Sequence, residues 1–98
     1  MNERANTDDW QCADLPISNK RGLHARASAK FVQVSEKFDA DITVEKDGTK
    51  VGGRSIMGLM LLAASMGSSV RVCVRGAERE AAMIAIRDLV ENRFGEDD

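Results

Sequence analysis

The sequence has few of the side chains from which specialised sites are usually built. Its 98 residues include one histidine, one proline, no tyrosine and two cysteines, Cys12 and Cys73. One histidine and two cysteines at this spacing match no zinc-binding pattern, so we expect no metal site. No apolar run approaches the roughly 20 residues that span a bilayer, and the N-terminal segment is polar. We therefore expect neither a membrane segment nor a secretory signal.

Aromatic residues are also few, and the net charge is small. Aromatics make up 4% of the chain, so the core must be mainly aliphatic. The formal net charge is −2, whereas a nucleic-acid-binding protein usually presents a basic face and aromatic rings on which bases stack. With 43% hydrophobic and 31% charged residues, the composition is typical of one small globular domain.

The two cysteines stand in strand-like runs that are far apart in the sequence. We interpret them as buried, reduced thiols, and a disulfide between them is the less favoured alternative. Reduced thiols are typical of cytoplasmic proteins. Together with the missing signal segment, they predict a cytoplasmic location.

The hydrophobic periodicity predicts a two-layer α/β (α+β) sandwich with the element order βαββαβα. The expected strands cover residues 12–17, 41–46, 49–52 and 69–75. The expected helices cover residues 24–38, 56–64 and 78–94. We expect the first and fourth strands to lie side by side in an antiparallel or mixed sheet with helices on one face.

The ends of the chain are polar and carry no periodic pattern. Residues 1–10 are predicted to form a flexible tail, anchored at its end by Trp10. Residues 11–95 form the domain, and residues 96–98 form a solvated acidic tail.

The only histidine lies in the run Gly22-Leu23-His24-Ala25-Arg26, where a helix is expected to begin. No acid occurs between Asp14 and Glu36. The lysines and arginines of this stretch give it a formal charge of about +4, namely Lys20, Arg21, Arg26 and Lys30. A helix N-terminus behaves like roughly half a positive charge and prefers carboxylates nearby. Cations at this place are understandable if an anion is held there by free backbone N–H groups.

His24 could serve as a nucleophile that carries a phosphoryl group. The helix amides of Ala25 and Arg26, with the Arg26 guanidinium, could position and neutralise it. Metal binding is disfavoured because there is no second histidine, and a catalytic triad because no acid lies nearby in the sequence to orient the ring. On the residues alone, a plain surface histidine remains an open alternative.

A second candidate site begins at Ser55, which precedes the apolar run 56–64. Serine there is a natural N-cap, and a phosphate on it would add close to two negative charges at the start of a helix. A plain N-cap serine is the alternative interpretation. The run holds too many large apolar residues for one buried face, so we expect Ile56, Met57 and Met60 to be exposed and Leu59 and Leu62 to be in the core.

Two motifs resemble those of the HPr family, the histidine-phosphorylated carriers of the bacterial phosphoenolpyruvate-dependent phosphotransferase system. GLHARASAKF is similar to the active-site motif of that family, and RSIMGLMLLAA to its second signature, around a regulatory serine. The motifs lie about thirty residues apart, as the family requires, and the resemblance covers roughly residues 11–94. It implies an open-faced sandwich whose four-stranded, mainly antiparallel sheet is covered on one face by three helices.

The resemblance also implies roles for individual residues. His24 would accept a phosphoryl group on Nδ1 from enzyme I and pass it to an EIIA-type domain, and Arg26 would contact that group. Ser55 would be modified by an HPr kinase/phosphorylase. The partners would dock on Ala25, Ile56, Met57 and Met60. The protein would be a monomeric, stoichiometric carrier without a cofactor, and not an enzyme.

The chain departs from the family pattern at two places. Ala27 stands where proline is usual, and proline would fix φ in the first helical turn. Lys20 and Arg21 replace small or amide residues and add charge beside the expected phosphoryl site. A regulatory interaction module that is read mainly through the state of Ser55 is the alternative function.

Overall fold

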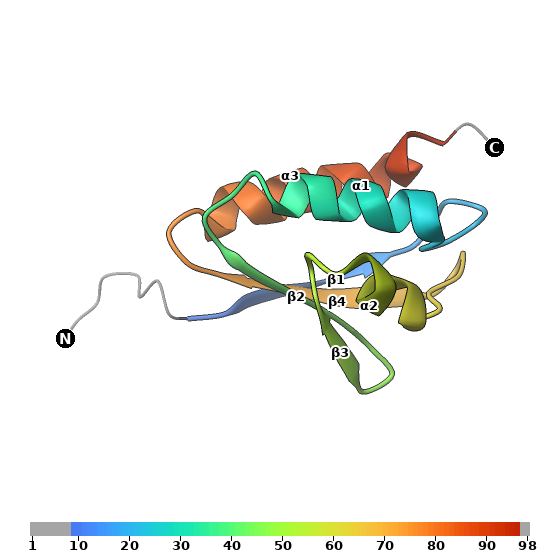
Figure 1. Cartoon of the computed structure of the whole chain (residues 1–98), viewed down its shortest axis with the longest axis horizontal. Helices are drawn as coiled ribbons and strands as arrows, with labels where there is room; N and C mark the ends of the chain where they lie inside the picture. Colours follow the sequence, from blue (N-terminus) through green and yellow to red (C-terminus); the bar gives the residue numbers. More distant parts are fainter. Residues whose placement is uncertain (1–8, 97–98) are drawn as a thin grey trace.

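The computed structural model describes residues 9–96, and the element order is the predicted βαββαβα (Figure 1). The strands are β1 (Gln11–Pro16), β2 (Asp41–Lys46), β3 (Thr49–Gly52) and β4 (Ser69–Arg75). The helices are α1 (Ala25–Ser35), α2 (Ile56–Leu61) and α3 (Arg79–Glu91), and a 3₁₀ turn, η1 (Arg93–Gly95), follows α3.

The four strands form one antiparallel sheet in the order β1-β4-β2-β3. The predicted pairing of the first and fourth strands is confirmed. Helices α1 and α3 lie side by side over one face of the sheet, and α2 packs beside α1 and β3 (Figure 1). The fold is therefore the open-faced α+β sandwich that the sequence predicts.

The core lies between the sheet and the helices, and it is mainly aliphatic. Alternate residues of β2 and β4 point to the helices and are buried, namely Ile42, Val44, Val70, Val72 and Val74. The helices contribute Ala27, Phe31, Ala82, Ile86 and Val90. Burial of each large apolar side chain stabilises the fold by about 1.5–3 kcal/mol, so this interface is the main source of stability.

All three helices end earlier than the periodicity predicts, and the first ends at Ser35 rather than at residue 38. The second helix ends at Leu61 rather than at residue 64, because Ala63 adopts a left-handed conformation with φ 52°. The third ends at Glu91 rather than at residue 94, because Arg93 and Phe94 have φ values of 55° and 54°. Apolar residues continue past both breaks, so the hydrophobic pattern alone does not reveal them.

Trp10, the only aromatic residue of the N-terminal segment, is anchored as predicted. The Arg75 guanidinium lies 4.5 Å from the centroid of its ring, in the geometry of a cation–π contact. The remainder of the predicted tail, residues 1–8, lies outside the described part of the chain. Between residues 9 and 96, no helix is long and apolar enough to cross a membrane.

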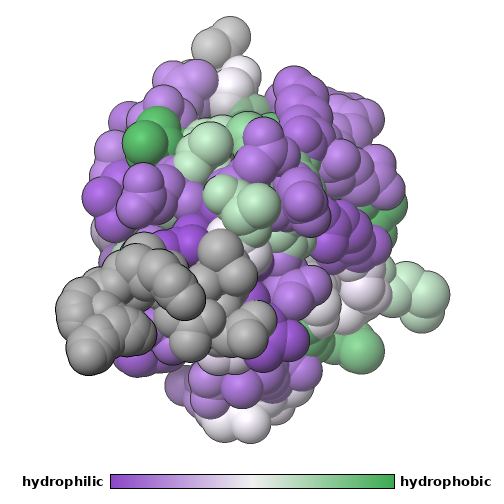
Figure 2. Space-filling view, turned by 90° about the vertical axis from the view of Figure 1, so that its left-hand side faces the viewer, coloured by the Kyte–Doolittle hydropathy of each residue, from purple (hydrophilic) through white to green (hydrophobic). Residues whose placement is uncertain are grey.

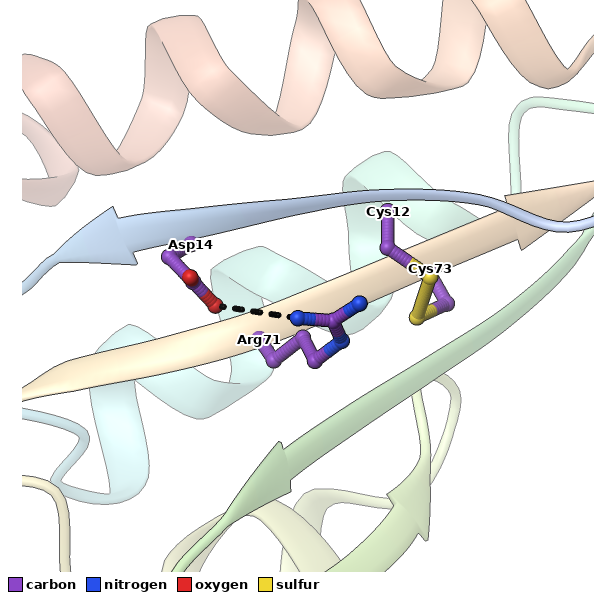
Figure 3. Close-up of a disulfide and its surroundings, with 4 residues drawn as sticks. All are labelled: Cys12, Asp14, Arg71 and Cys73. Carbon is purple, nitrogen blue, oxygen red and sulfur yellow. Dashed lines mark ion pairs between the residues drawn. A yellow bond between two sulfur atoms is a disulfide. The ribbon is translucent and has the colours of Figure 1, made fainter.

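The expectation of buried, reduced thiols is wrong: Cys12 is exposed, Cys73 is half-buried, and the two form a disulfide that joins β1 to β4. The two residues lie directly opposite each other in the antiparallel register, and Asp14 and Arg71 make the next pair on the same face, 3.8 Å apart (Figure 3). The sequence predicts that the two strands are neighbours, but it does not by itself fix the register that places these cysteines opposite each other. The disulfide also removes the thiol-based reason for a cytoplasmic location.

Reduction of this disulfide should lower stability markedly. The bridge closes a loop with a sequence separation of 61 residues. In the chain-entropy account, such a loop is worth about 4 kcal/mol, because the bridge restricts the unfolded chain. For a domain of this size, the thermal unfolding midpoint should fall by about 20 °C in the presence of a reductant, as measured by calorimetry or circular dichroism.

A Cys12→Ser, Cys73→Ser double variant is the matched control. Its midpoint should equal that of the reduced wild type and should not respond to reductant. A wild-type midpoint that is unchanged by reductant, in protein whose bridge is verified by mass spectrometry, would show that the bridge adds nothing to stability.

Candidate functional site

His24 caps the N-terminus of α1 with its own side chain. Its backbone is extended, with φ −74° and ψ −177°, and the imidazole Nδ1 accepts a hydrogen bond of 3.2 Å from the backbone N–H of Arg26. Serine, threonine, aspartate and asparagine normally perform this role. Here the cap is a titratable, nucleophilic ring that is held with one nitrogen against the positive end of the helix.

The loop before His24 is fixed against the segment that follows α2. The backbone N–H of Leu23 donates to the Ala64 carbonyl at 2.9 Å. Gly22 has a φ of 65°, and a Cβ on it would lie 2.2 Å from the Ala64 oxygen, so no other residue fits without a shift of the backbone. This close approach brings the two sequence motifs together in space.

The cations expected around His24 divide into two groups. The side chains of Lys20, Arg21 and Arg26 are exposed beside the start of α1. Lys30 is not one of these, because its ammonium donates to the Phe94 carbonyl at 2.7 Å and so holds the C-terminal segment. Three of the four predicted cations thus remain available to an anion at this helix end.

The sequence did not reveal Glu96, whose carboxylate Oε2 contacts the His24 Nε2. The prediction of a solvated side chain at this residue is wrong, since only 13% of the Glu96 side chain is exposed. Asp97 and Asp98 lie outside the described residues. The two contact partners are 72 residues apart, and the sole sequence signal was an acid directly after the helix-terminating Gly95.

Asn19 completes the polar cluster. Its side-chain Nδ2 donates to the Gly22 carbonyl at 2.8 Å and to Glu96 Oε1 at 3.0 Å, and the residue is fully buried. Burial tends to raise the pKa of Glu96. The hydrogen bonds from Asn19 and His24, with the charges of His24 and Arg21, outweigh that effect and hold the pKa of Glu96 below its ordinary value. Glu96 is therefore ionised at neutral pH.

Ser55 is the N-cap of α2, as predicted, and its hydroxyl oxygen accepts from the Gly58 N–H at 2.9 Å. The neighbouring Arg54 anchors this turn to the end of α1. Its Nη2 lies 3.0 Å from each of three backbone carbonyl oxygens, those of Ser35, Phe38 and Ala40. The Ser55 side chain itself is exposed, so it is accessible to a modifying enzyme.

Apolar side chains reach the surface around α2. The predicted exposure of Ile56, Met57 and Met60 is confirmed, with Met57 exposed to 75%, and Leu59 and Leu62 are buried. Leu61 and Met66, which the sequence interpretation did not single out, are also exposed. By contrast, the end of the molecule at which β1 begins is mainly hydrophilic (Figure 2). We call Ile56, Met57, Met60, Leu61 and Met66 the α2 patch.

The start of α1, the C-terminal segment and α2 therefore form one region of the molecule. Ala25 is exposed there, next to His24, and α1 packs against α2. Figure 1 shows that η1 lies near the start of α1, opposite the end at which β1 begins. Within residues 9–96, no group of three or more His, Cys, Asp or Glu side chains is placed to hold a metal ion.

Comparisons with known proteins identify the family. A family model described as the PTS HPr component phosphorylation site matches residues 12–92. The phosphocarrier protein HPr of Xylella fastidiosa is 50% identical over 84 residues, which is 86% of this chain and 94% of that protein.

Two solved structures from Thermoanaerobacter tengcongensis share the fold. A crystal structure of HPr-C-His has a TM-score of 0.85 and 46% identity, and the match covers 89% of this chain and 98% of that one. A crystal structure of an HPr dimer has a TM-score of 0.71 and 44% identity, with 98% and 100% covered. The family match, the sequence identity and the common fold together establish that this chain is a member of the HPr family of the phosphotransferase system.

Proposed function

We propose that this protein is a phosphocarrier that accepts a phosphoryl group from enzyme I on His24 Nδ1 and passes it to an EIIA-type domain. The single observation that carries the proposal is the position of Nδ1 at the N-terminus of α1. Backbone N–H groups of a helix start are ready donors to phosphate oxygens. The names of the relatives, which are phosphocarrier proteins, support the same function.

The chemistry requires little more than positioning and charge neutralisation. Phosphoryl transfer depends mainly on holding the reacting atoms in line and on cations near the transferred oxygens. The Arg26 N–H, which now donates to Nδ1, and the exposed Arg26 guanidinium are suited to this role. Such a protein is a stoichiometric carrier rather than an enzyme, and it requires no cofactor.

The α2 patch, together with Ala25, is proposed as the docking surface for both partners. Its exposed apolar side chains lie around α2, which packs against the helix that His24 caps. Methionine side chains are flexible and adapt to different partners, which suits a carrier that makes two successive interfaces. We also propose that the carrier acts as a monomer.

Ser55 is proposed as a regulatory site for an HPr kinase/phosphorylase. It is exposed, and it lies directly before Ile56 and Met57. A phosphate would remain compatible with the helix start and would place negative charge beside the α2 patch, where it would repel an acidic partner. The alternative function, a regulatory module read through Ser55, depends on this same exposure.

The cytoplasm is the proposed location, because the relay starts from phosphoenolpyruvate, a metabolite of that compartment. Disulfides are rare in the cytoplasm. The fold must then also be stable with Cys12 and Cys73 as thiols, and the reductant experiment described above measures that stability.

Replacement of His24 by alanine should abolish phosphoryl transfer. With enzyme I and labelled phosphoenolpyruvate, the wild type should acquire acid-labile, base-stable label, and His24→Ala none. Equal labelling of His24→Ala would refute the proposed function.

Arg26→Ala should fold with an unchanged unfolding midpoint, because Arg26 is exposed. It should accept label from enzyme I about tenfold more slowly than the wild type, since a charge-assisted contact to the phosphoryl group is lost.

Negative charge on the α2 patch should weaken docking without harm to the fold. Met57→Glu and Ser55→Asp should both lower the affinity for enzyme I by about tenfold, and Asp can still cap α2. Ile84→Glu, at an exposed apolar position of α3 outside the patch, is the matched control. Binding measured by calorimetry should be unchanged for Ile84→Glu, and unchanged binding for Met57→Glu would show that the docking surface lies elsewhere. If the wild type takes up no label from enzyme I and Ser55→Asp changes partner binding more than His24→Ala does, the regulatory module is favoured instead.

A further inference from the structure

The C-terminal segment is built to bring Glu96 to the start of α1. After α3, the residues Arg93, Phe94 and Gly95 all adopt left-handed conformations, with φ values of 55°, 54° and 76°. The Phe94 side chain is buried in the core, and Lys30 of α1 donates to the Phe94 carbonyl at 2.7 Å. Non-glycine residues rarely adopt positive φ, so consecutive ones persist only where packing holds them. The segment is thus held by a buried aromatic ring and a hydrogen bond.

Both oxygens of the Glu96 carboxylate have partners. Oε1 accepts from Asn19 Nδ2 at 3.0 Å, and Oε2 contacts His24 Nε2. Asn19 is fully buried, and its second amide hydrogen goes to the Gly22 carbonyl at 2.8 Å. The carboxylate is therefore fixed by a rigid donor and is aimed at one nitrogen of the imidazole.

The two hydrogen bonds of the ring require the same tautomer. An ionised carboxylate can only accept, so the Nε2 that faces Glu96 must carry a hydrogen. A backbone amide can only donate, so the Nδ1 that faces the Arg26 N–H must present its lone pair. We propose that Glu96 is a positioning residue that keeps the imidazole hydrogen on Nε2 and so presents the Nδ1 lone pair to phosphorus. This inference rests on the proposed function of His24 as the phosphoryl acceptor.

The carboxylate also supports the transfer step electrostatically. The Nδ1 lone pair forms the new N–P bond while the bond between phosphorus and the donor atom breaks, and that electron pair leaves with the donor atom. The ring, which keeps its hydrogen on Nε2, becomes a positively charged phosphoimidazolium. The negative charge of Glu96 stabilises this ring, as an acid does for an activated histidine in hydrolases. Because Glu96 contacts Nε2, it leaves the phosphoryl position at Nδ1 open.

The proposal is tested with ¹⁵N-histidine-labelled protein and with phosphoramidate, a chemical donor that needs no partner protein. In the donor reaction, Nδ1 attacks phosphorus, the P–N bond of phosphoramidate breaks, and its nitrogen departs as ammonia. The variants are Glu96→Gln, which has the same shape without the charge, and Glu96→Asp, which keeps a carboxylate. Glu91→Gln, which removes an exposed carboxylate at the last residue of α3, is the matched control.

In the wild type and in Glu91→Gln, the ¹⁵N shifts should place the hydrogen on Nε2, with a downfield, slowly exchanging Nε2–H proton. Glu96→Gln should lose that proton signal and accept phosphoryl from phosphoramidate about tenfold more slowly, the effect of one charge-assisted hydrogen bond. Glu96→Asp should recover part of both. The amide spectrum of each variant reports whether it is folded.

A wild-type Nε2–H signal and rate in Glu96→Gln would overturn this inference and leave the phosphocarrier function intact. A wild type that takes no label from enzyme I, but shows the Nε2–H signal and its loss in Glu96→Gln, would overturn the proposed function alone. The imidazole signals and the labelling by enzyme I therefore separate the two claims.

Discussion

The hydrogen bond from the Arg26 amide to Nδ1 of His24 determines how the rest of the site is organised. It makes the imidazole of His24 part of the helix terminus. The orientation of the ring is therefore fixed by a hydrogen bond from the backbone of α1. A helix start needs an acceptor, and a phosphoryl group on Nδ1 would bring oxygens that satisfy the same amides. The local requirement of the helix and the chemistry of a phosphocarrier thus coincide at one atom.

This arrangement depends on close contacts between distant parts of the chain. Gly22 lies against the Ala64 carbonyl, and Arg54 holds the carbonyls at the end of α1. The buried Asn19 connects the loop before His24 to Glu96. As a result, His24, the exposed Ser55 and the α2 patch occupy one region, although they come from different sequence motifs. The helices of that region pack against the sheet, and the disulfide within the sheet lies outside the region.

Much of the architecture could be predicted from the sequence. The strands at residues 41–46, 49–52 and 69–75 were predicted with their observed bounds, since alternation is strong and Asp47-Gly48 marks the turn. The N-cap at Ser55, the start of a helix at His24 and the exposure of Met57 also followed from local patterns. These features depend on residues close together in the sequence.

The features that the sequence did not predict depend on long-range geometry. The Cys12–Cys73 bridge follows from the register of β1 against β4, which alternation does not specify. Glu96 reaches His24 only because Arg93 and Phe94 turn the chain in left-handed conformations, for which neither residue type has a preference. A short acidic segment after a helix-ending glycine is usually exposed to solvent. Here the Phe94 side chain packs in the core, and this packing holds Glu96 against His24.

The most direct test of the central claim is to identify the imidazole nitrogen that bears phosphorus. Protein labelled with ¹⁵N-histidine, phosphorylated by enzyme I and phosphoenolpyruvate, would be observed by NMR for the one-bond coupling between ³¹P and ¹⁵N. Our account predicts this coupling at Nδ1, the nitrogen held at the start of α1. A coupling at Nε2, the nitrogen that faces Glu96, would contradict it.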